Sequence, residues 1–155
     1  MTRTRSRTAA AVLCTALAAT GLAGCGSSAS SSGTSGGPLT VESFKAQANA
    51  ICKAGNADIK QIGSGITISS SPTVVVQALH NAANRANKEV SDIRKLQAPS
   101  SIASAVNAWG DALNSATAKI LKGGIEVLSG ADPFAGADAK AKALGLTSCE
   151  SGSGT

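Results

Sequence analysis

Apolar residues between Pro38 and Cys149 recur at steps of three and four, and this spacing constrains the fold more than any other feature. Such spacing places apolar side chains on one face of an α-helix. The clearest stripe comprises Ile102, Val106, Trp109, Leu113, Ala116 and Ile120. No run alternates with a period of two over a length typical of a strand. The spacing therefore predicts an all-α domain over 38–149.

Two more stripes precede the one around Trp109, and a shorter helix is expected after Asp132-Pro133. The first stripe comprises Val41, Phe44, Ala48, Ile51, Gly55, Ile59 and Ile62. The second comprises Val75, Leu79, Ala82, Ala86, Val90, Ile93 and Leu96. The short helix carries Phe134, Ala137, Ala141 and Leu144. About four helices with short turns favour an antiparallel bundle, and its alanine-rich core buries little apolar area per contact.

Several residues match the preferences of helix ends. Thr40 is a suitable N-cap for the first helix, and Ser71 with Pro72 provides a cap and a first-turn proline for the second. Gly63-Ser64-Gly65 is expected to end the first helix, and Gly145 to follow the last residue of the fourth. These signals support the same four helices as the apolar stripes.

The first 24 residues have the organisation of an export signal. Arg3, Arg5 and Arg7 precede an apolar stretch over 9–22, which matches the basic and apolar regions of a secretory signal peptide. That stretch of about 14 residues is shorter than the roughly 20 needed to span a membrane as a helix. The alternatives at its end are an ordinary cleavage site with a coincidental cysteine or a lipoprotein site.

The sequence Leu22-Ala23-Gly24-Cys25 resembles a bacterial lipobox. The resemblance implies that diacylglycerol is attached to the Cys25 thiol and that cleavage before Cys25 removes residues 1–24. Residues 26–37 contain only Ser, Gly, Ala and Thr, a composition typical of a flexible linker. We therefore expect a signal peptide over 1–24, a lipidated linker over 25–37, the helical domain over 38–149 and a flexible tail over 150–155.

This organisation predicts a protein anchored to the extracytoplasmic face of the cell membrane through lipid on Cys25. Removal of the signal peptide would also change the net charge that a binding partner meets. Removing the three leader arginines from the 14 basic residues leaves 11 against 9 acidic residues, a formal charge of +2 instead of +5. Because nucleic-acid binding needs a dense basic patch, we expect no nucleic-acid partner.

Two of the four cysteines remain available to form a disulfide after the expected cleavage and lipidation. Cys14 is removed with the leader and Cys25 is acylated, which leaves Cys52 and Cys149. In an exported chain such a pair usually forms a disulfide. This one would close a loop of about 97 residues, contributing on the order of 4–5 kcal/mol in the chain-entropy model. A redox or metal pair is the alternative, but there is no CxxC spacing and His80 is the only histidine.

Two short segments carry a further resemblance. Ala48-Asn49-Ala50-Ile51-Cys52 and Leu144-Gly145-Leu146-Thr147-Ser148-Cys149 resemble segments of small helical secreted proteins and lipoproteins of actinobacteria. The resemblance implies a terminal disulfide and no catalytic activity. This sequence has Glu150 where the familiar pattern often has glycine after the last cysteine.

The sequence contains no group of residues that matches a known type of catalytic site. A catalytic triad needs a base beside its nucleophile, and His80 is expected on the protein surface. Glu89 and Asp92 are expected to form surface ion pairs with Arg85, Lys88 and Lys95. We therefore predict no catalytic residue, no metal site and no cofactor.

Trp109 is the one residue that the sequence suggests for ligand binding. Its place in the apolar stripe favours a core position, but a cleft beside it would let the indole line an apolar pocket between helices. The leading hypothesis is a non-enzymatic binding or interaction module, whose partner is an envelope protein or a small apolar ligand. The alternatives are an envelope enzyme with an unrecognised Ser, Asp or Lys site and an accessory structural subunit of an envelope complex.

Overall fold

The computed structural model describes residues 39–152, apart from the side chain of Leu128. The signal peptide, Cys25 and the linker predicted above lie outside the described residues, as do residues 153–155. The described part of the chain contains four α-helices, α1 (Val41–Gly63), α2 (Pro72–Lys95), α3 (Ser100–Gly123) and α4 (Ala135–Leu144). Two short 3-10 helices, η1 (Gly124–Ser129) and η2 (Thr147–Cys149), flank α4 in the sequence.

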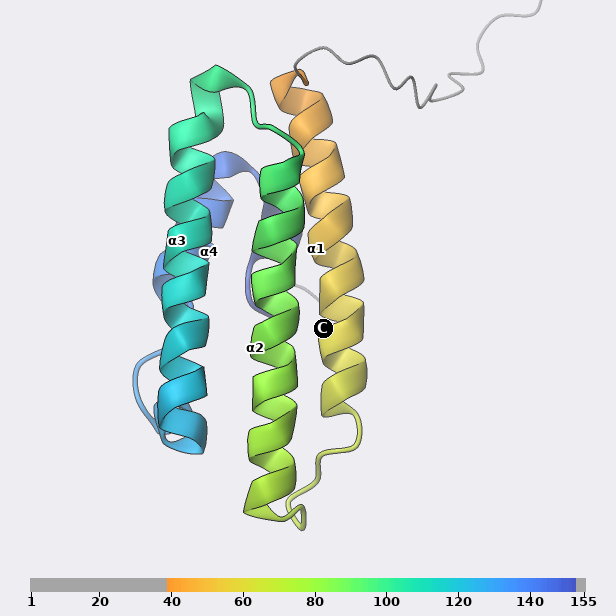
Figure 1. The fold of residues 1–155 in the computed structure, drawn as a ribbon, viewed down its shortest axis with the longest axis vertical. Helices are drawn as coiled ribbons and strands as arrows, with labels where there is room; N and C mark the ends of the chain where they lie inside the picture. Colours follow the sequence, from red (N-terminus) through yellow and green to blue (C-terminus); the bar gives the residue numbers. More distant parts are fainter. Residues whose placement is uncertain (1–38, 153–155) are drawn as a thin grey trace, which may run out of the picture. The chain divides into compact units, whose positions relative to one another are not determined.

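The helices form an all-α bundle, as the apolar spacing predicts. α1, α2 and α3 lie side by side and alternate in direction (Figure 1). α2 packs against both α1 and α3, while α4 packs against α3 and η2 packs against α1. Because α4 has 10 residues and α3 has 24, α4 spans about 15 Å and α3 about 36 Å. α4 can therefore cover only part of the length of the bundle.

Helix ends follow the predicted signals at most positions. Thr40 caps α1 by accepting a hydrogen bond from the backbone N–H of Ser43, and Ser71 caps α2 through the N–H of Val74. Gly145 follows α4 with a φ of 73°, a left-handed conformation that glycine adopts without steric cost.

The fourth helix begins later than expected. Phe134 is the residue before α4 rather than part of it. Asp132 accepts a hydrogen bond from the N–H of Phe134 at 2.8 Å. The aspartate therefore stabilises the turn before α4 and does not cap the helix itself.

The core confirms the predicted stripe of α3. Of its six residues all are buried except Ile102, which is half-buried. One hydrophobic cluster joins α1, α2, α3, α4 and the segment after α4, and its buried members include Phe44, Ile93, Trp109, Ala141 and Leu146. This cluster gathers the N-terminal half of α1, the C-terminal half of α2 and the N-terminal half of α3 around α4.

Candidate functional site

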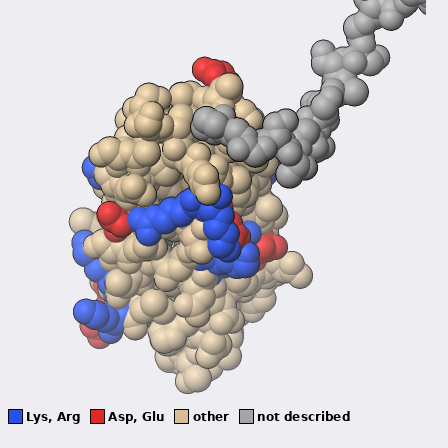
Figure 2. Space-filling view, turned by 45° about the horizontal axis from the view of Figure 1, so that its top comes forward, with Lys and Arg blue, Asp and Glu red and all other residues tan. Residues whose placement is uncertain are grey.

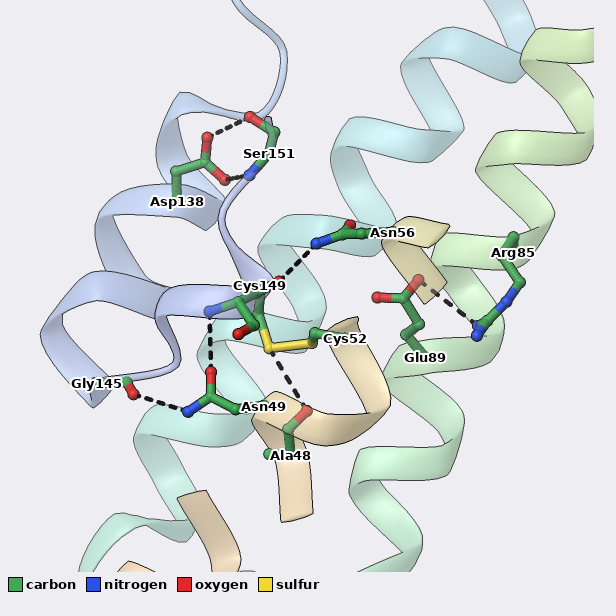
Figure 3. Close-up of a disulfide and its surroundings, with 11 residues drawn as sticks. Ala48, Asn49, Cys52, Asn56, Arg85, Glu89, Asp138, Gly145, Cys149 and Ser151 are labelled. Carbon is green, nitrogen blue, oxygen red and sulfur yellow. Dashed lines mark hydrogen bonds and ion pairs between the residues drawn. A yellow bond between two sulfur atoms is a disulfide. The ribbon is translucent and has the colours of Figure 1, made fainter. Parts of the chain in front are cut away.

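The C-terminal segment is attached to α1 by a disulfide. Cys52 of α1 and Cys149 of η2 are bonded, with their Cα atoms 5.0 Å apart (Figure 3). The predicted terminal disulfide is thus present. Because the two cysteines are 97 residues apart in sequence, the bond fixes the end of the domain to its beginning.

Two asparagines on the same face of α1 hold the backbone of this segment. Asn49 donates a hydrogen bond to the carbonyl of Gly145 at 3.1 Å and accepts one from the N–H of Ser148 at 2.9 Å. Asn56 donates to the carbonyl of Ser148 at 2.7 Å. With Cys52 between them, these side chains lie at steps of three and four along α1 (Figure 3). Sequence analysis did not assign a role to either asparagine.

Beyond Cys149 the chain is held by a second set of hydrogen bonds. The N–H of Ser151 donates to Oδ1 of Asp138 at 2.7 Å, and its hydroxyl donates to Oδ2 of the same carboxylate. Ser151 belongs to the segment that was expected to be a tail. The pair fastens residues 150–152 to the first turn of α4.

A pocket of about 210 Å³ lies between α1, α2 and α3, with the start of α4 and residues 149–152 along its edge. The large apolar side chains that line it are Ile59, Leu79, Leu113, Ile120 and Phe134. Alanines 82, 83 and 86 of α2 also line it, and their small side chains leave the space open. The pocket lies beside the first turn of α4, where this short helix begins.

Glu89 is the charged residue most deeply placed in this pocket. It lines the space, yet the residue is only 4 % exposed. Its Oε1 has no hydrogen-bond partner among the described residues. A buried carboxylate oxygen without a hydrogen bond costs free energy because it loses its hydration. Glu89 is therefore a candidate for contact with a ligand.

A glycine of α1 makes room for this carboxylate. A Cβ atom added at Gly55 would lie 1.8 Å from Oε1 of Glu89, far inside van der Waals contact. Every residue other than glycine at this position would displace the Glu89 side chain or separate α1 from α2. Gly55 belongs to the predicted apolar stripe of α1, where its function is to admit the carboxylate of Glu89.

One arginine links Glu89 to a surface aspartate. Nε of Arg85 is 2.7 Å from Oδ2 of Asp58, whereas its Nη1 is 3.6 Å from Oε1 of Glu89. The second distance exceeds that of a normal hydrogen bond. Figure 3 shows one carboxylate oxygen of Glu89 directed at Arg85 and the other pointing away from it. Arg85 thus pairs closely with Asp58 and only loosely with Glu89.

Burial raises the pKa of Glu89 from its ordinary value of 4.5 to about 7. The positive charge of Arg85 opposes this rise in pKa, and the negative charge of Asp58 adds to it. Desolvation therefore outweighs the nearby guanidinium. The expected ion pair between Glu89 and Arg85 is present at 3.6 Å, but the sequence-based placement of Glu89 on the surface was wrong, because the residue is only 4 % exposed. The residue occupies a position of the apolar stripe, three residues after Ala86 and four before Ile93, and this spacing was the signal of its burial.

Asp92 follows the prediction more closely. Its carboxylate pairs with Lys88 and, at 2.9 Å, with Lys95. Hydrogen bonds from Lys88 and Lys95 lower the pKa of Asp92 from 3.8 to about 2. On the face that Figure 2 shows, basic side chains form a short band with acidic side chains beside it. The single carboxylate of Asp92 pairs with two ammonium groups, so Lys88, Asp92 and Lys95 together carry a net charge of +1.

Trp109 and His80 lie outside the pocket. Trp109 is 1 % exposed within the core cluster, and its Nε1 has no hydrogen-bond partner among the described residues. Leu113 and Ile120 of the same helix line the pocket, whereas Trp109 is not one of its lining residues. His80 of α2 is half-buried and also does not line the pocket. The site is thus one turn or more along α3 from the tryptophan that sequence analysis selected.

Within residues 39–152, no group of three or more His, Cys, Asp or Glu side chains is arranged to hold a metal ion. The helices of the same region all lack the combination of length and hydrophobicity that a membrane span requires. No family model, curated protein or solved structure matches this chain.

Proposed function

We propose that this chain is a lipid-anchored envelope protein whose helical domain is a binding module for a small, largely apolar ligand. The main support for a binding role is the pocket between α1, α2 and α3. Its lining combines five large apolar side chains with a few polar groups, which is the usual composition of a small-molecule site. The alanines of α2 keep the space open between helices that otherwise pack closely.

The proposal of a lipid anchor rests on the sequence alone. The lipobox ending at Cys25 and the Ser/Gly linker after it would place the pocket a short distance from the outer face of the membrane. A linker of about 12 residues behaves as a coil with a root-mean-square length of roughly 20 Å. Two acyl chains give stable anchoring, whereas one gives marginal and reversible binding.

A Cys25→Ser variant tests the anchor. The native protein is expected in the membrane fraction, carrying the mass of a diacylglycerol group on residue 25. The variant is expected to lack this mass and to leave the membrane fraction or retain its leader. Normal membrane retention of the variant would contradict the anchor.

Binding is tested with benzyl alcohol, an uncharged probe of suitable size, because cavities of ~150 Å³ accept benzene. The full-length chain is titrated in detergent micelles and followed by NMR. Shifts are expected at alanines 82, 83 and 86. Ala82→Leu should fill the space and weaken binding at least tenfold. Ala118→Leu, at an exposed position of α3, is the matched control and should bind like the native chain. Equal binding by all three proteins, or no saturable binding, would contradict the binding role.

A further inference from the structure

Oε1 of the buried Glu89 carboxylate accepts no hydrogen bond from the described residues. Among the described residues, its one charged neighbour at ion-pair distance is Arg85, at 3.6 Å. On the side of α1, Gly55 presents only backbone, whose amide in mid-helix is already engaged. Nη1 of Arg85 also lacks a hydrogen-bond partner among the described residues, and at 3.6 Å it is too far from Oε1 for a normal hydrogen bond. A donor that enters the pocket would supply the hydrogen bond that this carboxylate lacks.

The charges around the pocket indicate which kind of donor fits. Its lining includes the three acids Glu89, Asp138 and Glu150, and no Lys, Arg or His is among the described residues that line it. Arg85 carries one positive charge against the two negative charges of Asp58 and ionised Glu89. The cluster around Arg85 thus has a net charge of −1 when Glu89 is ionised, and a cation would neutralise it.

The rest of the pocket requires an apolar body. Leu113, Ile120 and Phe134 line it together with the alanines of α2. Burying an apolar group there gains about 25 cal/mol for each Å² removed from water. A ligand that satisfies both parts has a compact hydrocarbon group and a cationic head with N–H donors.

We propose that the pocket binds an amphipathic amine, with its ammonium group on the carboxylate of Glu89 and its hydrocarbon body between Leu113, Ile120 and Phe134. This inference rests on the proposed binding role and specifies its ligand. An ammonium group has three donors, so it can hydrogen-bond to Glu89 while it neutralises the charge. Charge-assisted hydrogen bonds of this kind are roughly twice as strong as neutral ones.

The experiment compares three probes of nearly the same shape, which are benzylamine, benzyl alcohol and benzoate. Each is titrated into the full-length chain in the same micelles at about pH 8, where Glu89 is mostly ionised. Benzylamine is expected to bind at least tenfold more tightly than benzyl alcohol, and benzoate more weakly than both. In Glu89→Gln the ratio between amine and alcohol should fall close to one. Glu126→Gln, an exposed acid of η1 outside the pocket, is the matched control and should keep the native ratio.

If Glu89→Gln does not fold, the amine preference can instead be tested by measuring the binding of benzylamine and benzyl alcohol to the native chain over a series of pH values. The native preference for benzylamine should increase from about pH 5 to about pH 8, because Glu89 gains its charge in this interval. The charged groups that face Glu89 are Arg85 and Asp58, and Asp138 and Glu150 line the same pocket.

The outcomes separate this inference from the binding role. Equal affinity for amine and alcohol, tighter binding of benzoate, or a preference that is unchanged by pH would overturn the amine specificity and leave the pocket a binding site. Failure of all three probes to bind would overturn both proposals.

Discussion

The two halves of the bundle interior are built differently, although the same three long helices run through both. In the half that α4 covers, Phe44, Ile93 and Trp109 are at most 1 % exposed and pack in one cluster. In the other half, alanines and half-buried Leu79 surround the pocket. Glu89 lies where the two halves meet, and among the described residues its Oε1 has no hydrogen-bond partner. This difference indicates that the short α4 completes the core in one half of the bundle, whereas the half that it does not cover contains the pocket.

The largest expected difference between the halves follows from truncating one apolar side chain in each. Phe44→Ala should lower the free energy of unfolding by about 3–5 kcal/mol, because it removes buried area and leaves a cavity. Leu79→Ala should cost only about 1 kcal/mol, since Leu79 is half-buried and already borders open space. Urea denaturation followed by circular dichroism measures both. Equal losses would mean that the two halves are packed alike.

The disulfide joins the packed half to the edge of the pocket, since Cys149 lines the pocket and Cys52 lies in the core cluster. Replacing both cysteines by serine should reduce the free energy of unfolding by about 2–5 kcal/mol, because a loop of this length is no longer closed in the unfolded chain. Reducing the native protein should give the same loss. A difference below about 1 kcal/mol would show that Asn49 and Asn56 hold the segment without the bond.

The buried acid should make stability depend on pH. The pKa of Glu89 is about 7 in the folded protein and 4.5 in the unfolded chain, so the folded state binds more protons between these values. The free energy of unfolding should therefore fall as the pH rises from about 4.5 to 7, by at most about 3 kcal/mol. Asp92 acts in the opposite sense and at lower pH, because its pKa is lowered: the stability that it contributes above its ordinary pKa is lost as the pH falls toward 2.

Glu89→Gln isolates the contribution of the buried acid. This variant should lose the decline in stability between about pH 4.5 and 7, whereas Asp92→Asn should retain it. Thermal unfolding over a pH series provides the measurement. An unchanged decline in Glu89→Gln would assign the titration to another group.

The smallest expected effect concerns the space that Gly55 provides. Gly55→Ala should destabilise the fold by about 1–3 kcal/mol, because the added methyl group meets the Glu89 carboxylate. Gly63→Ala is the matched control on α1, where nothing lies within 4 Å of the added atom, and should be neutral or slightly stabilising. In a Glu89→Ala background the cost at Gly55 should shrink. A cost that is independent of residue 89 would mean that the helices, not the carboxylate, limit the space.

Most of the helical architecture could be predicted from local sequence. Helix formation depends on neighbours three and four residues apart, so the stripe of α3 and the cap residues Thr40 and Ser71 were identified correctly. The pairing of Cys52 with Cys149 could also be predicted, since no other cysteine stays available once Cys14 and Cys25 are assigned elsewhere.

The candidate site depended on tertiary structure for a different physical reason. Whether Glu89 is solvated or buried depends on the residues that face it, and Gly55, which makes room for its carboxylate, lies on another helix. Likewise, the pocket lies beside the start of the short α4, and the hydrogen-bonded residues Ser151 and Asp138 line part of it. Periodicity within one helix assigns its faces, but burial and charge pairing between helices are decided only when the helices pack together.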